Sequence, residues 1–254
     1  VAGRAVTLDL NGKTLTNNSQ IVVRGVLTIV ANGGKVEGSG TIAPDGTEPF
    51  IEKAPTVIAD AGITVRKPNG ATQYVCDNSA KTITTFVLAT VGEANYYDIR
   101  EAIAAAKTSG TTLVLNASIS LNSALVVEAG ESLAINLNGK TLTGKITDGA
   151  LVVNNGTLKL NGGTIDNGAS NDRLTDVSNN GVIAVNGTTI QYFTDNAEAT
   201  IAATDGSTVY CTSFRAAMNT ARDGDTVTLL KNVEISELIK IEKAITLNLG
   251  GKSV

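Results

Sequence analysis

Short stretches in which hydrophobic and polar residues alternate run along most of the chain, and Gly or Asn separates them. Leu133, Ile135 and Leu137 recur at a period of two, which places their side chains on one face of a strand. A continuous apolar run at 150–153 is instead expected of a strand that is buried on both faces. The strands predicted in this part of the chain are 112–115, 133–137, 150–153, 157–160 and 164–165. The pattern indicates a mainly β protein built from short strands.

Two windows depart from this pattern and have the period of an amphipathic helix. Apolar residues stand at i, i+3, i+4 and i+7 in both, at 99, 102, 103 and 106 and again at 214, 217, 218 and 221. Asp98 and Ser213 precede the two stripes as N-caps. We expect helices at about 98–108 and 213–222, with Ile103 and its counterpart Met218 facing the strands and Lys107 in solvent.

One heptapeptide recurs along the chain. LDLNGKT at 8–14 returns as INLNGKT at 135–141 and as LNLGGKS at 247–253, and other matches keep the same order between these points. Such order indicates a tandem duplication with a unit well over 100 residues long. We divide the chain into a first unit lacking its start (1–85), a complete second unit (86–199) and the start of a third (200–254). An array cut out of phase is expected to be part of a longer protein.

The recurring string also contains the turn signal that decides between two β architectures. Asn and Gly tolerate positive φ, so each Asn-Gly pair can mark a sharp change of chain direction. Hairpin turns would give an antiparallel sandwich, whereas corners between short stacked strands would give a parallel β-helix. Only a few turn residues separate the strands between 151 and 165, which favours a solenoid coil. The expected structural corners are Asn11, Gly12, Asn138, Gly139, Gly250 and Gly251.

The segments LDLNGKTLT, GALVVNNGTLKLNGGTI and VYCTSFRAAMNTARDGDTVTLLKNVEIS resemble known proteins. They are similar to the repetitive right-handed parallel β-helix modules of bacterial cell-surface proteins and of phage fibre and spike proteins, within the pectate-lyase-like superfamily. The resemblance covers most of the chain and rests on structural motifs. It implies stacked parallel sheets with one short amphipathic helix per tandem unit, and it implies no single activity.

Composition narrows the chemistry that the 254 residues can perform. Histidine is absent, which removes Ser-His-Asp and Cys-His nucleophiles and every His-containing metal site. The net charge of −4 argues against a nucleic-acid surface, and no apolar run is long enough to span a membrane. Cys76 and Cys211 make no disulfide framework and are interpreted as isolated thiols. No cofactor is expected.

The best candidate for catalysis is the loop DNGASNDRLTDVSNN. Asp172 and Asp176 could activate a water or bind Ca²⁺, and Arg173 could bind a sugar carboxylate. The alternative is a solvated polar loop. The matching segment of the first unit keeps neither the acid spacing nor the Arg, so we favour a site without catalysis or metal.

Tyr74 and Tyr192 recur in the related strings QYVCDN and QYFTDN and are weak candidates for binding. Exposed tyrosines stack on sugars. The alternative, which we favour, is that these rings seal the junction between helix and strands.

These observations favour a non-catalytic extracellular module, structural or adhesive, that acts as a rigid spacer or display element on a bacterial surface or virion. A polysaccharide-binding or polysaccharide-degrading β-helix enzyme is one alternative, and a subunit of a phage head or tail fibre, which would form a homotrimer, is another. The partners expected are surface carbohydrate or neighbouring repeats of a longer chain, without nucleic acid or membrane insertion.

Overall fold

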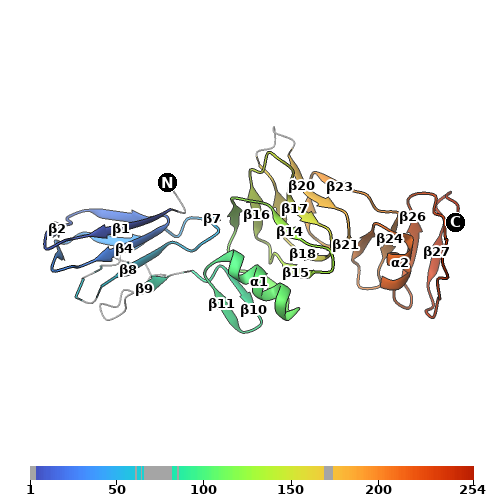
Figure 1. The fold of residues 1–254 in the computed structure, drawn as a ribbon, viewed down its shortest axis with the longest axis horizontal. Coiled ribbons are helices and arrows are strands. Elements are labelled where there is room, and N and C mark those ends of the chain that lie inside the picture. The colour runs from blue at the N-terminus through green and yellow to red at the C-terminus, as the bar shows by residue number, and fades with distance from the viewer. Residues whose placement is uncertain (1–3, 61, 64, 66–81, 85, 169–173) are drawn as a thin grey trace.

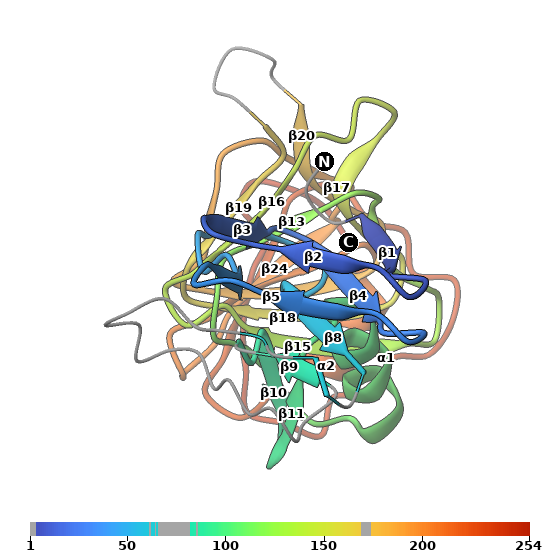
Figure 2. The same ribbon diagram turned by 90° about the vertical axis from the view of Figure 1, so that its left-hand side faces the viewer.

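Stacked parallel coils make up most of the protein, as the sequence predicted. The computed structural model describes residues 4–60, 62–63, 65, 82–84, 86–168 and 174–254. Its strands form a β-solenoid accompanied by two short helices in the described residues. The chain progresses along one long axis, from the first strands at one end to β27 (Thr246–Asn248) at the other (Figure 1). Seen along this axis, the first strands stand in front of the rest of the chain (Figure 2).

The second unit forms a solenoid in which each coil contributes one strand to each of three sheets. Ile135 pairs with Leu160 and Leu160 pairs with Val185, so the last three coils are 25 residues apart, whereas Leu113 of the first coil pairs with Ile135 at a spacing of 22. Leu113, Ile135 and Leu160 are buried in one column, and burying each such side chain stabilises the fold by roughly 1.5–3 kcal/mol. The four coils are β12 (Leu113–Leu115), β13 (Ile119–Leu121) and β14 (Leu125–Val127); β15 (Ser132–Asn136), β16 (Thr141–Gly144) and β17 (Ala150–Asn154); β18 (Thr157–Asn161), β19 (Thr164–Asp166) and β20 (Thr175–Asn179); and β21 (Val182–Asn186), β22 (Thr189–Ile190) and β23 (Phe193–Asp195).

The first unit repeats this plan around its own small core. Leu8 lies opposite Ile29 and Ile29 lies opposite Ala59 in a parallel sheet, to which β9 (Thr82–Thr84) adds an antiparallel strand. Leu10, Ile29 and Val57 are buried together. The other strands are β1 (Ala5–Asp9), β2 (Thr14–Thr16), β3 (Gln20–Val23), β4 (Val26–Val30), β5 (Lys35–Glu37), β6 (Thr41–Pro44), β7 (Phe50–Ile51) and β8 (Thr56–Ala59).

Antiparallel strands next to each helix are a feature that the sequence pattern did not predict. Before α1 (Ile99–Ser109), β10 (Ala89–Val91) pairs antiparallel with both β11 (Ala94–Tyr96) and β12. Before α2 (Phe214–Thr220), β24 (Ala199–Ala202) pairs in the same way with β25 (Thr208–Cys211) and β26 (Thr226–Leu229). The strand–strand–helix–strand order is therefore common to the second and third units.

Both helices lie where the periodicity placed them, and both begin at the predicted caps. The side chain of Asp98 accepts the N–H of Arg100, and that of Ser213 accepts the N–H of Ala216. Gly110 ends α1 in the left-handed region at φ 69°. The third unit's helix is shorter than predicted, because Ala221 is already extended at ψ 148°.

The apolar stripe of α1 is buried as predicted, but Lys107 is not in solvent. Ile99, Ala102, Ile103 and Ala106 are buried against the core of the second unit. The ammonium of Lys107 pairs with Glu131 at 2.5 Å and donates to the carbonyl oxygen of Val126 at 2.7 Å. The prediction of a free lysine was wrong because the coil after the helix returns beneath its last turn.

Opposite faces of the ten-stranded sheet are buried in the second and third units. We call this change the exchange of faces. Ile183 of β21 points into the core of the second unit, whereas Val182 and Ala184 point outward. In the antiparallel register, Val182 lies opposite Cys211 and Ala184 opposite Val209, so these four side chains share one face. That face is the buried core of the third unit. The outer surface of one solenoid therefore continues as the inner surface of the next.

Candidate functional site

The loop proposed for catalysis contains a buried acid that binds backbone groups. The carboxylate of Asp176 accepts the N–H groups of Asn167, Gln191 and Tyr192 at 2.7, 3.0 and 2.9 Å. Only 1% of Asp176 is exposed. Its three hydrogen bonds hold the loop before β20 against the loop before β23. Asp172 and Arg173 lie outside the described residues, so a constellation of these two residues with Asp176 stays a prediction.

Of the two tyrosine candidates, the structure describes the surroundings of Tyr192. Tyr192 is half-buried, and its hydroxyl accepts a hydrogen bond from the side-chain amide of Gln191 at 3.2 Å. Tyr74 lies outside the described residues. Tyr210 packs edge-on against Phe193 with the ring centroids 5.2 Å apart, and both rings pack against the core of the second unit. Sealing by aromatic rings is thus seen at Tyr210, whereas a sugar-binding role of Tyr192 stays a prediction.

The corner residues lie at exposed two-residue turns. Asn11 and Gly12 have φ of 42° and 73°, and Asn138 and Gly139 have φ of 51° and 73°. The N–H of Lys13 donates to the carbonyl oxygen of Leu10 across the first turn at 2.7 Å, and Lys140 and Leu137 form the same bond. Positive φ at both central residues requires Asn or Gly. Gly250 and Gly251 repeat this geometry at φ of 57° and 76°.

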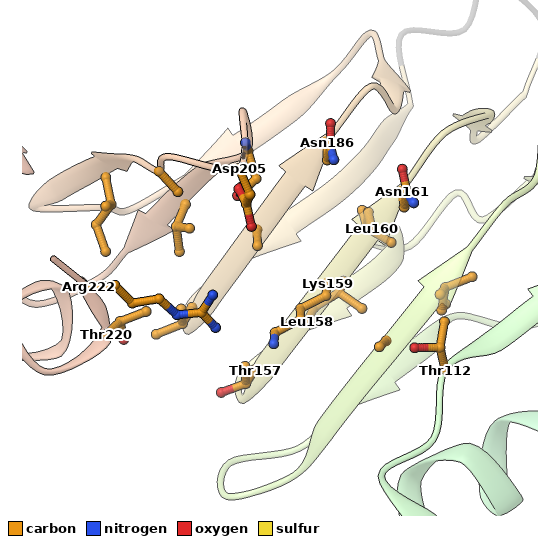
Figure 3. Close-up of a pocket in the computed structure, with 18 of the residues that line it drawn as sticks. Thr112, Thr157, Leu158, Lys159, Leu160, Asn161, Asn186, Asp205, Thr220 and Arg222 are labelled. Carbon is orange, nitrogen blue, oxygen red and sulfur yellow. Dashed lines mark hydrogen bonds between the residues drawn. The ribbon is translucent and has the colours of Figure 1, made fainter. Parts of the chain in front are cut away.

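A groove of about 350 Å³ lies on the outer face of the ten-stranded sheet, where the second unit meets the third (Figure 3). Its floor is made by β15, β18 and β21, which present Ala134, Lys159 and Ala184 side by side in register. One wall is the turn between β24 and β25, and the other is the segment that follows α2. The exchange of faces creates this groove, because it sets the third unit beside the outer surface of the second.

A single buried carboxylate joins the two walls. Asp225 is 2% exposed, and its two oxygens accept the N–H of Thr204 at 2.9 Å and the N–H of Arg222 at 2.8 Å. Thr204 belongs to the turn between the hairpin strands, and Arg222 follows α2. This bridge fixes the backbone from which Asp205 and Arg222 extend into the groove. It also occupies the N–H of Arg222, which helps to end α2 early.

The groove carries charged side chains of both signs. Lys159 rises from the floor, and the guanidinium of Arg222 extends from the end of α2 toward β18 (Figure 3). The hydroxyl and the N–H of Ser207 hold the pKa of Asp205 below its usual value, and the charges of Arg222 and Lys159 lower this pKa further. Asp205 is therefore a carboxylate at neutral pH. Asp225 also lines the groove, but it is buried and both of its oxygens accept backbone N–H groups. The exposed charges of the groove are therefore two cations, Lys159 and Arg222, against the single acid Asp205.

Sequence reasoning missed this groove, although part of its signal is present in the chain. Asn136, Asn161 and Asn186 end three successive strands and are 25 residues apart. One polar residue at the same position in each coil predicts a row of polar side chains along one face of a solenoid. The approach of Arg222 to that row depends on the exchange of faces, for which we found no sequence signal.

Metal and thiol chemistry receive no positive support. Among the described residues, no three Cys, Asp or Glu side chains gather as metal ligands. Cys211 is fully buried and unpaired, and burial raises the pKa of its thiol to about 12. Cys76 lies outside the described residues. The helices seen in the structure are all too short and too polar to cross a bilayer.

Comparison with known proteins identifies no relative from which a role for the groove can be transferred. No family model matches the sequence, and neither a curated protein nor a solved structure matches it significantly. The parallel solenoid and its repeats are therefore the properties on which a function must be argued.

Proposed function

We propose that the chain is a non-catalytic β-solenoid module that serves as a rigid spacer or display element outside the cell, on a bacterial surface or a virion. The observation that carries this proposal is the way in which successive units are joined. Each junction uses strand pairing and shared core, which resist bending more than a peptide linker does.

At the first junction, a strand of the first unit joins a sheet of the second unit. Strand β7 pairs in parallel with β13, so that Phe50 lies opposite Ile119. Phe50 is buried in the core of the second unit. The carboxylate of Glu52 pairs with Arg100 of α1 at 2.7 Å, and Lys53 pairs with Asp98 at 2.9 Å. Apolar burial and partly buried ion pairs thus act together at one junction.

The second junction is a continuous sheet. Strand β21, the last of its sheet in the second unit, pairs over four residues with β25 of the third. Tyr210 of β25 packs on the core of the second unit, while its neighbours Val209 and Cys211 lie in the core of the third. A bend here would break backbone hydrogen bonds and expose both cores.

Distances between spin labels test this rigidity. In a Cys76→Ser background, labels at Val22→Cys and Asp148→Cys span the first junction, and labels at Asp148→Cys and Asn219→Cys span the second. All three positions are exposed. Labels at Asp148→Cys and Thr189→Cys within the second unit give the control. We expect all three pairs to give equally narrow distance distributions by double electron–electron resonance.

Broad distributions across a junction, next to a narrow one within the second unit, would contradict the spacer role. Cleavage of a polysaccharide that is lost in Asp176→Asn while the fold is retained would contradict the non-catalytic role.

A further inference from the structure

The groove contains an arginine that has lost the ion pair made by its counterpart in the repeat. Lys107 and Arg222 occupy equivalent positions, each one residue after the last apolar residue of its helical stripe. Lys107 pairs with Glu131, but the position of Glu131 is taken in the third unit by Lys243. The ammonium of Lys243 binds the carbonyl oxygens of Asn219 and Ala221 at 2.7 and 2.6 Å. Arg222 therefore extends into the groove instead of onto its own coil (Figure 3).

The second cation stands on a floor that offers it no anion. Lys159 is exposed between Ala134 and Ala184, which lie opposite it on the neighbouring strands. Within the described residues, neither the Lys159 ammonium nor the Arg222 guanidinium makes an ion pair within 4.0 Å. Asp205 is the nearby carboxylate that acts on both, and the hydroxyl and N–H of Ser207 bind it.

A row of amides continues the floor beyond the cations. Asn136, Asn161 and Asn186 lie side by side on adjacent strands, about 4.8 Å apart, a spacing close to the length of one sugar ring. The side-chain oxygen of Asn136 accepts the N–H of Asn138 at 2.9 Å. In the described part of the chain, the side chains of Asn161 and Asn186 make no hydrogen bond to protein, so their donor and acceptor atoms are available. Ala134 and Ala184 keep the floor low enough for a flat ligand.

From these observations we infer that the groove binds a segment of an anionic polysaccharide. Lys159 and Arg222 bind its carboxylate or phosphate groups, and the asparagine row binds its hydroxyl groups. This inference goes beyond the spacer role and does not depend on it. The groove is formed at the junction of the second and third units, and it would be present even if the chain bent elsewhere.

Two other polymers fit the groove less well. A peptide cannot extend the floor as an added strand, because β15, β18 and β21 are paired on both edges. Single-stranded nucleic acid binds through aromatic stacking platforms, and no aromatic side chain lines the groove.

Binding is tested with the whole chain and three polymers by isothermal titration calorimetry at low salt. Alginate supplies carboxylates, a phosphomannan supplies phosphates, and dextran is neutral. We expect binding to alginate, to phosphomannan or to both, with none to dextran and with weakening as salt is added. The anionic polymer that binds identifies the acidic group recognised. Binding of neither anionic polymer, or equal binding of dextran, would overturn the inference.

Charge-matched variants locate the site. The double variant Lys159→Ala/Arg222→Ala is expected to lose affinity by about tenfold or more, because both ion pairs to the ligand are removed. The control Lys13→Ala/Lys252→Ala removes the same charge from exposed turn positions and is expected to retain the affinity within about twofold. Asp205→Asn is expected to tighten binding by removing a repelling charge. Equal losses in the two double variants would indicate diffuse attraction and overturn the site.

A variant that keeps every charge completes the test. Ala134→Trp fills the floor beside Lys159 and is expected to weaken binding as strongly as the double variant. Circular dichroism melting checks that the fold is retained. Unchanged affinity in a folded Ala134→Trp protein would show that the polymer binds elsewhere, whereas the spin-label distances would still decide the spacer role separately.

Discussion

At the scale of single residues, Ile103 offers the most direct test of how α1 stabilises the second unit. Its side chain is 8% exposed and belongs to the main core. Ile103→Ala should lower the free energy of unfolding by about 2–5 kcal/mol, because it removes buried methyl groups and leaves a cavity. We expect Met218→Ala to cost less, since the core of the third unit is smaller and relaxes more easily. Urea denaturation measures both values, and equal negligible shifts would mean that the helices are free linkers.

Asn179 tests the polar part of the interior. Its buried amide accepts the side-chain N–H of Asn154 at 2.7 Å and donates to the carboxylate of Asp195 at 2.9 Å, which forms a ladder along the coils. Asn179→Ala removes one hydrogen-bond partner from each of these side chains, although Asn154 still donates to the carbonyl oxygen of Val182 and Asp195 still accepts the N–H of Ala197. We expect a loss of about 1–3 kcal/mol in urea denaturation. Asn180→Ala is the matched control on the exposed ladder beside it and should change stability by less than about 0.5 kcal/mol. Similar losses in both variants would refute a special role of the buried ladder.

Residue patterns predicted burial better than they predicted polar contacts. Leu10 and Leu137 are buried next to exposed corners, because an apolar side chain beside an Asn-Gly turn has one stable orientation. Lys107 was expected in solvent, since a sequence does not show which carbonyl groups a later coil brings beneath a helix. For the same reason Asp176 resembled a free acid, although three backbone N–H groups surround it.

At the scale of elements, the ion pair between Lys107 and Glu131 fastens α1 to the turn before β15. The Lys107 ammonium, followed by the N–H of Glu128, holds the pKa of Glu131 below its usual value of 4.5. The folded protein therefore releases this proton more readily than the unfolded chain does. The stability that the pair contributes is present above pH 4.5 and is lost as the pH falls through the lowered pKa.

Glu131→Gln should accordingly lower the urea midpoint at pH 7, and the difference from the native protein should shrink as the pH falls below 4.5. The exposed Glu93→Gln is the control, for which we expect no pH-dependent difference. A difference that stays constant from pH 7 to pH 3 would show that the ion pair does not stabilise the folded state.

The positions of both helices and of the strands predicted in the second unit followed from the sequence because each signal is local. The stripe at 99, 102, 103 and 106 and the cap at Asp98 lie within one element. The hairpins β10–β11 and β24–β25 were missed, since their strands are short and their partners include strands beyond the following helix. The groove was missed for a related reason: three of its elements come from the second unit and two from the third.

At the scale of the whole molecule, we expect the second and third units to unfold together, because the antiparallel pairing of β21 with β25 joins them in one sheet. Cys211 is a natural reporter of this coupling, because it pairs with Val182 of the second unit on one side and with Ala199 of the third on the other. Its thiol is fully buried and its pKa is raised to about 12, so reaction requires local or global opening. In a Cys76→Ser background, labelling by a thiol reagent should stay slow until urea reaches the concentration at which the second unit unfolds. The folding of that unit is monitored by the environment of Tyr96, which packs on its core at the end of the sheet opposite to the junction. Fast labelling of Cys211 while the environment of Tyr96 remains native would show that the junction opens alone and that stiffness ends at β21.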